Sequence, residues 1–196
     1  RNSSMIGGKV RDTEVNRGDV NNSQIGFAIG GPIIKDKVFF FANLEIEKRS
    51  DLGSYFIPAA NGVSGSNISR VLESDMLFVS NMLKTKFNYE TGAVKDFKHN
   101  ADNNKGLIRL DFNLNKNHKL SASYNFLDAF KDKPAHPSAI GPRGPSLQTL
   151  QFENSGYTIN NKIHSGIIEL KSVFGNKYAN KFQAGYTAFR DSRDPF

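Results

Sequence analysis

The sequence contains no cysteine and no tryptophan, and it has no long uninterrupted apolar run. The absence of cysteine excludes disulfides and thiolate-bound metals, but it is neutral about the cellular compartment. A helix that crosses a membrane needs about 20 predominantly apolar residues in succession, and no part of the sequence approaches that length. If this chain spans a membrane, it must therefore do so with β-strands.

Charge of one sign is not concentrated anywhere in the chain either. The net charge is +7 over 196 residues, and the lysines are scattered, mostly through predicted turns and loops. Because neither a basic stripe nor a nucleic-acid-binding motif is present, we do not expect a nucleic acid as a partner. The chain starts at Arg1 without an initiator methionine or an apolar signal region and ends at Phe196 without a stop signal, so we expect a piece of a longer protein.

The most informative stretch is 24–48, which predicts two strands joined by a short charged turn. In its second half, apolar residues alternate strictly with a set that includes carboxylates. One face carries Val38, Phe40, Ala42, Leu44 and Ile46. The other carries Phe39, Phe41, Asn43, Glu45 and Glu47. Since successive side chains of a strand point to opposite faces, this period of two predicts a strand that separates an apolar from a polar environment.

The same pattern recurs twice, so we expect about six long strands in three hairpins. Gly31 and Pro32 are expected to break the first ladder, and the density of prolines in 131–154 excludes a central strand there. The expected order is an outer loop at 1–23, a first hairpin at 24–49, a long outer loop at 50–103, a second hairpin at 104–130, a Pro-rich outer loop at 131–154, a third hairpin at 155–190 and the start of the next outer loop at 191–196.

The first long loop contains one stretch with helical periodicity, at about 66–87. Ser66 or Asn67 is the expected N-cap, and Lys84 and Lys86 suit the C-terminal end of a helix dipole. The residues on or near one stripe are Ile68, Val71, Leu72, Asp75, Phe78, Val79, Met82 and Leu83. We therefore predict one amphipathic helix that packs on the rest of its own loop.

The connections alternate in length, with short turns at one end of the strands and long loops at the other. This asymmetry is typical of outer-membrane barrels, in which the apolar face of each strand contacts lipid and the polar face lines the interior. A soluble sandwich could share the alternation, with its apolar face as the core. The predicted fold class is all-β: a segment of an antiparallel transmembrane β-barrel with one helix in a long outer loop.

Four stretches, in this order, carry a resemblance to a known family. They are 30–42 (GGPIIKDKVFFFA), 66–89, 109–115 (RLDFNLN) together with His118, and 124–129 (YNFLDA). Together they resemble the N-terminal part of the barrel of TonB-dependent outer-membrane receptors, in particular the Oar-like and SusC-related group of Bacteroidota.

The resemblance implies a barrel of roughly 22 strands with a plug domain inside it. It also implies a carboxypeptidase regulatory-like domain before the plug, a location in the outer membrane of a Gram-negative bacterium, and energised uptake of a ligand by plug remodelling rather than enzymatic chemistry. The implied partners are outer-membrane lipid, the plug and the remaining barrel of the same chain, a surface lipoprotein and the TonB energy-coupling machinery. The loops at 50–103 and 131–154 are expected to contact the ligand. The alternatives are a barrel that only docks partners in a surface assembly and a soluble all-β binding domain.

The sequence supplies no residue set for catalysis, a cofactor or a metal. Eight charged residues are expected on the inner face, where they would line a substrate route or pair with one another, the plug or water. They are Glu45, Glu47, Arg109, Asp111, Lys119, Glu169, Lys171 and Lys181. The four histidines, His99, His118, His136 and His164, lack the spacing of a metal site. The stretch 100–104 is oxygen-rich but lacks the spaced carboxylates of a calcium loop, so we expect a solvated loop.

Overall fold

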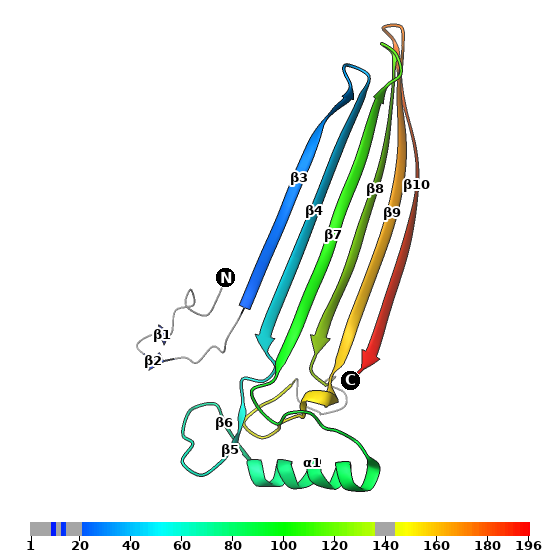
Figure 1. The fold of residues 1–196 in the computed structure, drawn as a ribbon. Helices are drawn as coiled ribbons and strands as arrows, with labels where there is room; N and C mark the ends of the chain where they lie inside the picture. The colour runs from blue at the N-terminus through cyan, green and yellow to red at the C-terminus, as the bar shows by residue number, and fades with distance from the viewer. Residues whose placement is uncertain (1–8, 11–12, 15–20, 136–143) are drawn as a thin grey trace.

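A single antiparallel sheet dominates the computed structural model, which describes residues 9–10, 13–14, 21–135 and 144–196 (Figure 1). Its six strands are β3 (Asn21–Ile34), β4 (Val38–Leu52), β7 (Lys98–Asn113), β8 (His118–Lys133), β9 (Tyr157–Phe174) and β10 (Tyr178–Pro195). They lie in the order in which the chain visits them, and β3 and β10 form the two edges of the described sheet. The predicted all-β fold with three hairpins is confirmed, as a sheet that does not close on itself within the described residues.

Tight turns connect the two strands of each hairpin at one end of the sheet, and every longer connection lies at the other end (Figure 1). The first turn places Asp36 at a φ of 62°, a left-handed conformation that short polar side chains tolerate. In the second turn, the side-chain oxygen of Asn115 accepts hydrogen bonds from the backbone nitrogens of Asn117 (2.9 Å) and His118 (3.0 Å). Polar turn residues thus fix the register of the long strands that follow them.

The first hairpin differs from the prediction at Gly31 and Pro32. Strand β3 continues through both residues to Ile34, with a register shift between Pro32 and Ile34. Proline, which has no backbone N–H, is tolerated here because the irregularity removes the need for a regular ladder bond. The predicted break is therefore a bulge within the strand.

The sheet has one face, here called the apolar face, on which aligned rows of hydrophobic residues cross all six strands. One row comprises Ile34, Val38, Phe112, Leu120, Leu170 and Phe182. The row four residues further along comprises Ile29, Ala42, Ile108, Tyr124, Gly166 and Tyr186. These rows are exposed, with relative exposures of 57% for Ile29, 56% for Ile108 and 59% for Phe182. A soluble sandwich would bury them.

The apolar rows end before the strands do. From Val38 to Ile46 the apolar face of β4 extends for about 27 Å at 3.4 Å per residue, or roughly 20 Å of height at the usual tilt of barrel strands. In the same cross-strand row as Ile46, the neighbouring strands already carry charged residues on this face: Asp128, Lys162 and Arg190. Strands of 14 to 18 residues are longer than the 9–11 residues that cross a bilayer, so their polar ends project beyond the apolar zone.

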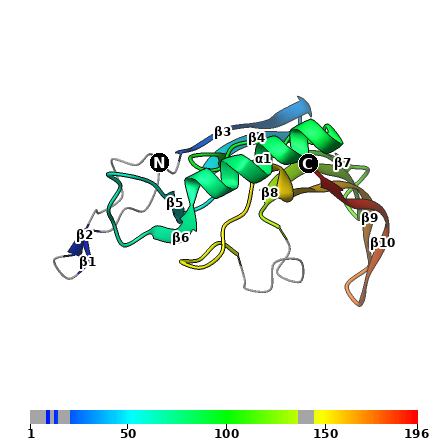
Figure 2. The ribbon, with the colours of Figure 1, turned by 90° about the horizontal axis from the view of Figure 1, so that it is seen from below.

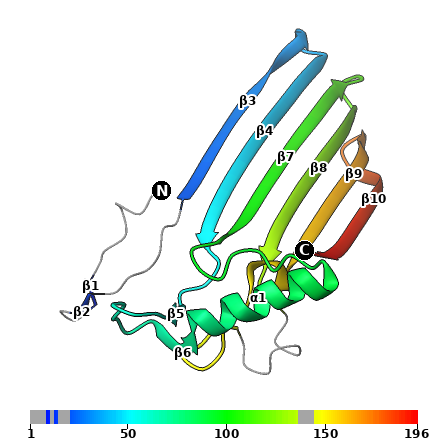
Figure 3. The ribbon, with the colours of Figure 1, turned by 60° about the horizontal axis from the view of Figure 1, so that its bottom comes forward.

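A small folded unit, here called the loop platform, lies across the long-loop end of the sheet (Figure 3). It contains β5 (Ile57–Ala59), which pairs in parallel with β6 (Ile68–Leu72), then α1 (Glu73–Phe87) and the 3₁₀ helix η2 (Glu153–Ser155). Viewed along the strands from this end, the sheet is a curved single layer with α1 crossing in front of it (Figure 2). In the predicted outer loop at 1–23, the structure describes only a short pair, β1 (Lys9–Val10) with β2 (Thr13–Glu14), and the start of β3.

The helix begins at Glu73 rather than at the predicted position 66. Residues 68–72 are extended because they pair with β5, and the backbone nitrogen of Arg70 donates to the carbonyl of Leu147 at 2.9 Å. The side chain of Asn67, a predicted N-cap, instead donates to the carbonyl of Tyr55 at 3.0 Å. The end of the helix follows the prediction: Asn88 has a φ of 51° and its nitrogen caps the carbonyl of Lys84.

Candidate functional site

All eight predicted inward charges lie on one face of the sheet, here called the charged face, opposite the apolar face. The strand register places them in two groups. Glu45 and Glu47 lie toward the long loops. The other six lie toward the tight turns: Arg109, Asp111, Lys119, Glu169, Lys171 and Lys181.

The group toward the long loops has partners on neighbouring strands that the sequence alone does not indicate. Glu45 forms an ion pair with Lys105 on β7 and accepts a hydrogen bond from Gln24 Nε2 at 2.6 Å. Glu47 accepts a hydrogen bond from Asn103 Nδ2 at 2.9 Å. Lys105 lies on the same face of β7 as Arg109, but the apolar Leu107 between them interrupts the polar pattern. Strand β7 also begins earlier than predicted, at Lys98.

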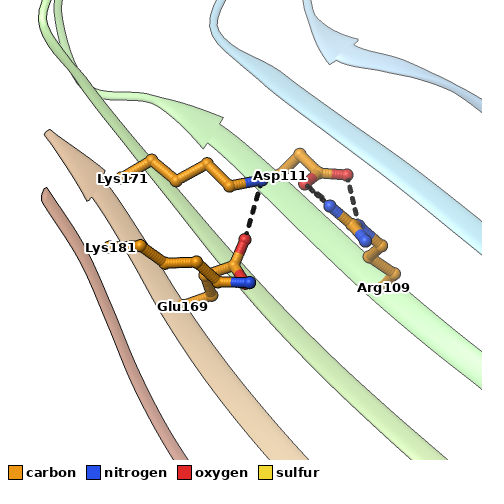
Figure 4. A network of polar contacts seen from close by, with 5 residues as sticks. All are labelled: Arg109, Asp111, Glu169, Lys171 and Lys181. Carbon is orange, nitrogen blue, oxygen red and sulfur yellow. Dashed lines mark hydrogen bonds and ion pairs between the residues drawn. The ribbon is translucent and has the colours of Figure 1, made fainter. Parts of the chain in front are cut away.

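Five of the six residues toward the tight turns form ion pairs, on β7, β9 and β10 (Figure 4). Arg109 donates to Asp111 through two nitrogens, Nε to Oδ2 at 2.9 Å and Nη2 to Oδ1 at 2.8 Å. Glu169 receives the ammonium groups of Lys171 at 2.9 Å and Lys181 at 2.6 Å on its two oxygens. The Glu169 side chain is only 16% exposed, so the two lysines cover the carboxylate and present positive charge to the space in front of the sheet.

Three lysines lie directly opposite one another on neighbouring strands, and we call them the lysine row. Lys119 on β8 pairs in register with Lys171 on β9, which pairs in register with Lys181 on β10. Among the described residues, no ion pair is found for Lys119. Like charges in directly opposed positions of a sheet destabilise it, so the row depends on the anions beside it.

A hollow of about 230 Å³ lies in front of this network. Its polar lining comes from Arg109, Asp111, Asn113, Lys119, Ser121, Glu169 and Lys171. With Lys181, the cluster has four cations and two carboxylates, which gives a net charge of +2 (four minus two). Because both carboxylates already have partners, they leave this positive charge in place. The arrangement can therefore attract and bind an anion.

The histidines do not form a metal site within the described residues, where no group of three potential ligands comes together. His118 lies at the start of β8 and contacts Ser172 Oγ through Nδ1 at 2.8 Å. His164 lies on the apolar face, where its Nδ1 is 2.7 Å from the hydroxyl of Tyr124. His136 lies outside the described residues. The predicted solvated loop at 100–104 is instead part of strand β7.

His99 lies where the sheet meets the loop platform. Its ring centroid is 5.6 Å from that of Phe97 and 6.4 Å from that of Phe196. Burial lowers the pKa of His99 below its ordinary value, although the carboxylates of Asp132 and Glu153 act in the opposite direction. Burial of the imidazole therefore favours its neutral form.

The loop platform joins the two long loops through hydrogen bonds between 89–93 and 153–154. Tyr89 donates its hydroxyl to the carbonyl of Asn154 at 3.0 Å, and Glu153 Oε2 accepts from the nitrogen of Ala93 at 2.8 Å. Thr91 is 1% exposed and its hydroxyl lies 2.7 Å from that of Ser80 on α1. The two predicted ligand-facing loops therefore form one connected surface.

The helix of the platform packs differently from the prediction. Of its residues only Met76 is buried, whereas Phe78 and Val79 of the predicted packed stripe are exposed. A shallow hollow of about 300 Å³ separates part of α1 from the 148–152 segment. The helix contacts its support through a narrow strip, which leaves Leu77, Phe78 and Phe87 facing outward.

Comparison with known proteins agrees with this geometry. Residues 8–86 match the family model described as "Outer membrane beta barrel domain". The sheet is a segment of an outer-membrane β-barrel. In such a barrel the apolar face contacts membrane lipid, and the charged face lines the interior. Searches of the curated proteins and of the solved structures returned no significant match. Among the described residues, the helical segments are all too short or too polar to cross a membrane.

Proposed function

We propose that this barrel segment belongs to a TonB-dependent receptor that takes up a bound ligand across the outer membrane. The family description specifies a barrel in the outer membrane, and energised uptake is our extension of it. The observation that carries the proposal is the combination of an ionic inner wall with a structured platform at only one end of the strands. A pore with a fixed, folded entrance is suited to selecting a ligand before it enters.

The shape of the sheet supports a wide barrel. Six strands in a curved sheet leave both edges unpaired within the described residues, so further strands are needed to satisfy them. The charged face includes charge clusters at both ends, which need water or protein in front of them rather than lipid. We propose that a plug domain fills this interior and that its movement, without covalent chemistry, releases the ligand inward.

The decisive experiment replaces residues 54–96 of the full-length receptor by an Asn-Gly turn. The structure gives these limits because the nitrogen of Gly53 bonds to the carbonyl of Phe97 at 2.9 Å, so the ladder of β4 and β7 closes at that point. We expect the shortened protein to insert in the outer membrane but to lose ligand uptake. Uptake at the wild-type rate would reject the platform as the ligand-selecting element.

Dependence on the energy-coupling machinery is tested separately, by measuring uptake through the wild-type receptor in cells with and without that machinery. We expect uptake only in cells that have it. Equal uptake in both strains would mean that the barrel admits its ligand passively. That result would reject the proposed receptor class.

A barrel that docks a surface partner is the second candidate, and the exposed side chains of Leu77 and Phe78, at 53% and 67%, favour it. Contiguous exposed apolar surface marks interaction sites, and Leu77 and Phe78 are consecutive exposed residues of α1. The double variant Leu77→Ser, Phe78→Ser is the matched test, because it removes the exposed apolar groups without changing the ladder. Loss of a partner with normal growth on every nutrient tested would favour docking, whereas loss of uptake supports the receptor.

A further inference from the structure

The lysine row is an unusual feature of the inner wall. Lys119, Lys171 and Lys181 occupy directly opposed positions on three adjacent strands, all on the charged face. Cross-strand like charges destabilise a sheet, so a sequence that keeps three in one row needs something to offset their repulsion.

The described part of the chain supplies only part of that compensation. Glu169 holds Lys171 and Lys181, and Asp111 is already engaged by Arg109 through two nitrogens. Within the described residues, Lys119 has no carboxylate in ion-pair range. The cluster therefore retains positive charge at the side that faces the barrel interior.

The space in front of the row has the dimensions of a small ligand. Adjacent strands are about 4.8 Å apart, so the three lysines extend over roughly 10 Å. The hollow of about 230 Å³ is lined by Lys119 and Lys171 of the row and also by Asn113 and Ser121. The amide nitrogen of Asn113 donates one hydrogen to the carbonyl of Asp36 at 3.0 Å, which leaves its second hydrogen and the Ser121 hydroxyl to donate to an anion. A ligand with two or more anionic groups can contact several lysines at once, whereas a single charge cannot offset the net charge of the cluster.

We propose that the lysine row, with Asn113 and Ser121, is a binding site for a small solute that carries two or more phosphate or carboxylate groups. The strand register places the site on the inner wall toward the tight turns, and the loop platform lies at the opposite end of the strands (Figure 1). It goes beyond the proposed receptor function and does not depend on it, since it requires only that the charged face line the barrel interior.

Binding is measured by titration calorimetry on the purified full-length protein in detergent at low salt. The probes are inorganic triphosphate and citrate, which distinguish phosphate from carboxylate preference, and acetate as a monovalent reference. We expect triphosphate or citrate to bind at least tenfold more tightly than acetate. Equal binding of all three, or no binding of triphosphate and citrate to the wild-type protein, overturns the proposal and would point to an acidic polypeptide covering the row.

The test variant is Lys119→Gln, Lys171→Gln, Lys181→Gln. Its matched control is Lys37→Gln, Lys116→Gln, Lys177→Gln, which removes the same charge from the three tight turns at the same end of the sheet. We expect the test variant to bind the preferred probe at least tenfold more weakly and the control to stay within about twofold. An equal loss in both variants would mean nonspecific attraction and overturn the site.

Folding is controlled in two ways. Heat-modifiable gel mobility of each variant reports whether the barrel is intact, and the charge-conserving variant Lys119→Arg, Lys171→Arg, Lys181→Arg should retain binding within a few-fold. Lys119→Gln alone should weaken binding about threefold without leaving Glu169 unpaired. Because binding is measured without transport, a protein that binds triphosphate but imports nothing would reject the receptor function and leave this site standing.

Discussion

The sheet and the loop platform solve the problem of stability by different means. The sheet is held together by regular pairing between long strands, and its large apolar side chains are exposed on one face. The platform has little regular pairing, yet it holds nearly all of the buried side chains outside the strands, including Met76, Phe97 and Thr91. The sheet therefore needs a lipid environment to complete it, whereas the platform carries its own small core in water.

This difference predicts that the two regions respond to different substitutions. A charge placed on the apolar face should destabilise the sheet only in a membrane, and the same charge on the opposite face should be tolerated. A change to a buried group of the platform should open the platform and leave the sheet paired. Each prediction below tests one side of that contrast.

The largest effect is expected for Ile108→Arg, at the centre of the apolar zone. An arginine at the bilayer midplane costs about 2–4 kcal/mol in a barrel, and Ile108 lies in the middle row of the apolar face. The measurement is equilibrium unfolding of the full-length protein in lipid vesicles.

The control for that substitution is Asn125→Arg, on the charged face of the neighbouring strand. An inward arginine stays in contact with water or protein, so a change within about 0.5 kcal/mol is expected. If the two arginines cost the same, the assignment of the two faces is reversed or the sheet does not lie in lipid.

A smaller effect, confined to the platform, is expected for Thr91→Val. The substitution keeps the shape of a 1% exposed side chain but removes the partner of the Ser80 hydroxyl. Leaving the partly buried hydroxyl of Ser80 without its partner should cost about 1 kcal/mol, at the low end of the range for unsatisfied groups, and this cost should favour local opening of the platform. Hydrogen exchange should accelerate for amides in 73–97 and stay unchanged in β7 to β10; acceleration in both would show that the two regions unfold together.

The strands could be predicted from the sequence because each strand has lipid on one side and the barrel interior on the other. Apolar and polar residues therefore tend to alternate along it. From Val38 to Glu47 one face is wholly apolar, and the other face changes from Phe39 and Phe41 to Asn43, Glu45 and Glu47; the register places these two sets on opposite faces. The platform could not be predicted in the same way, because its structure depends on contacts between distant parts of the chain. The contact of Ser69 with the carbonyl of Leu147 joins residues 78 positions apart, and it keeps 68–72 extended where local periodicity favours a helix.

For the inner wall, too, the sequence predicts only part of the structure. The sequence supplies the eight inward charges, but the pairing of Glu45 with Lys105 and the alignment of three lysines in one row follow from register. Register depends on turn length and on the position of each bulge, so a one-residue error in a turn would have separated these groups. Alternation alone predicts which face a residue takes, and only the pairing predicts its neighbours.

Salt concentration should affect the stability of variants in the two groups of the charged face differently. Glu169→Gln leaves Lys171 and Lys181 without their shared carboxylate, so we expect a lower denaturation midpoint at 10 mM salt that recovers at 150 mM, because the screening length falls from about 30 Å to about 8 Å. Glu47→Gln is the matched control, since its partner is the neutral amide of Asn103. Equal salt dependence in both variants would mean that the lysines of the row do not repel one another.

The smallest effect is expected at the boundary between the regions, where His99 ends the sheet against Phe97. Burial lowers the pKa of His99 in the folded protein, so the unfolded chain binds a proton more readily, and stability must fall as the pH drops below the ordinary histidine value of about 6.5. Hydrogen exchange at amides 96–100 should therefore be faster at pH 5.5 than at pH 7.5 after correction for intrinsic rates, while the centre of β7 stays protected. The variant His99→Gln should abolish this difference. If the pH dependence survives in that variant, the nearby carboxylates of Asp132 and Glu153 control the boundary, and protonation of the imidazole does not couple the platform to the sheet.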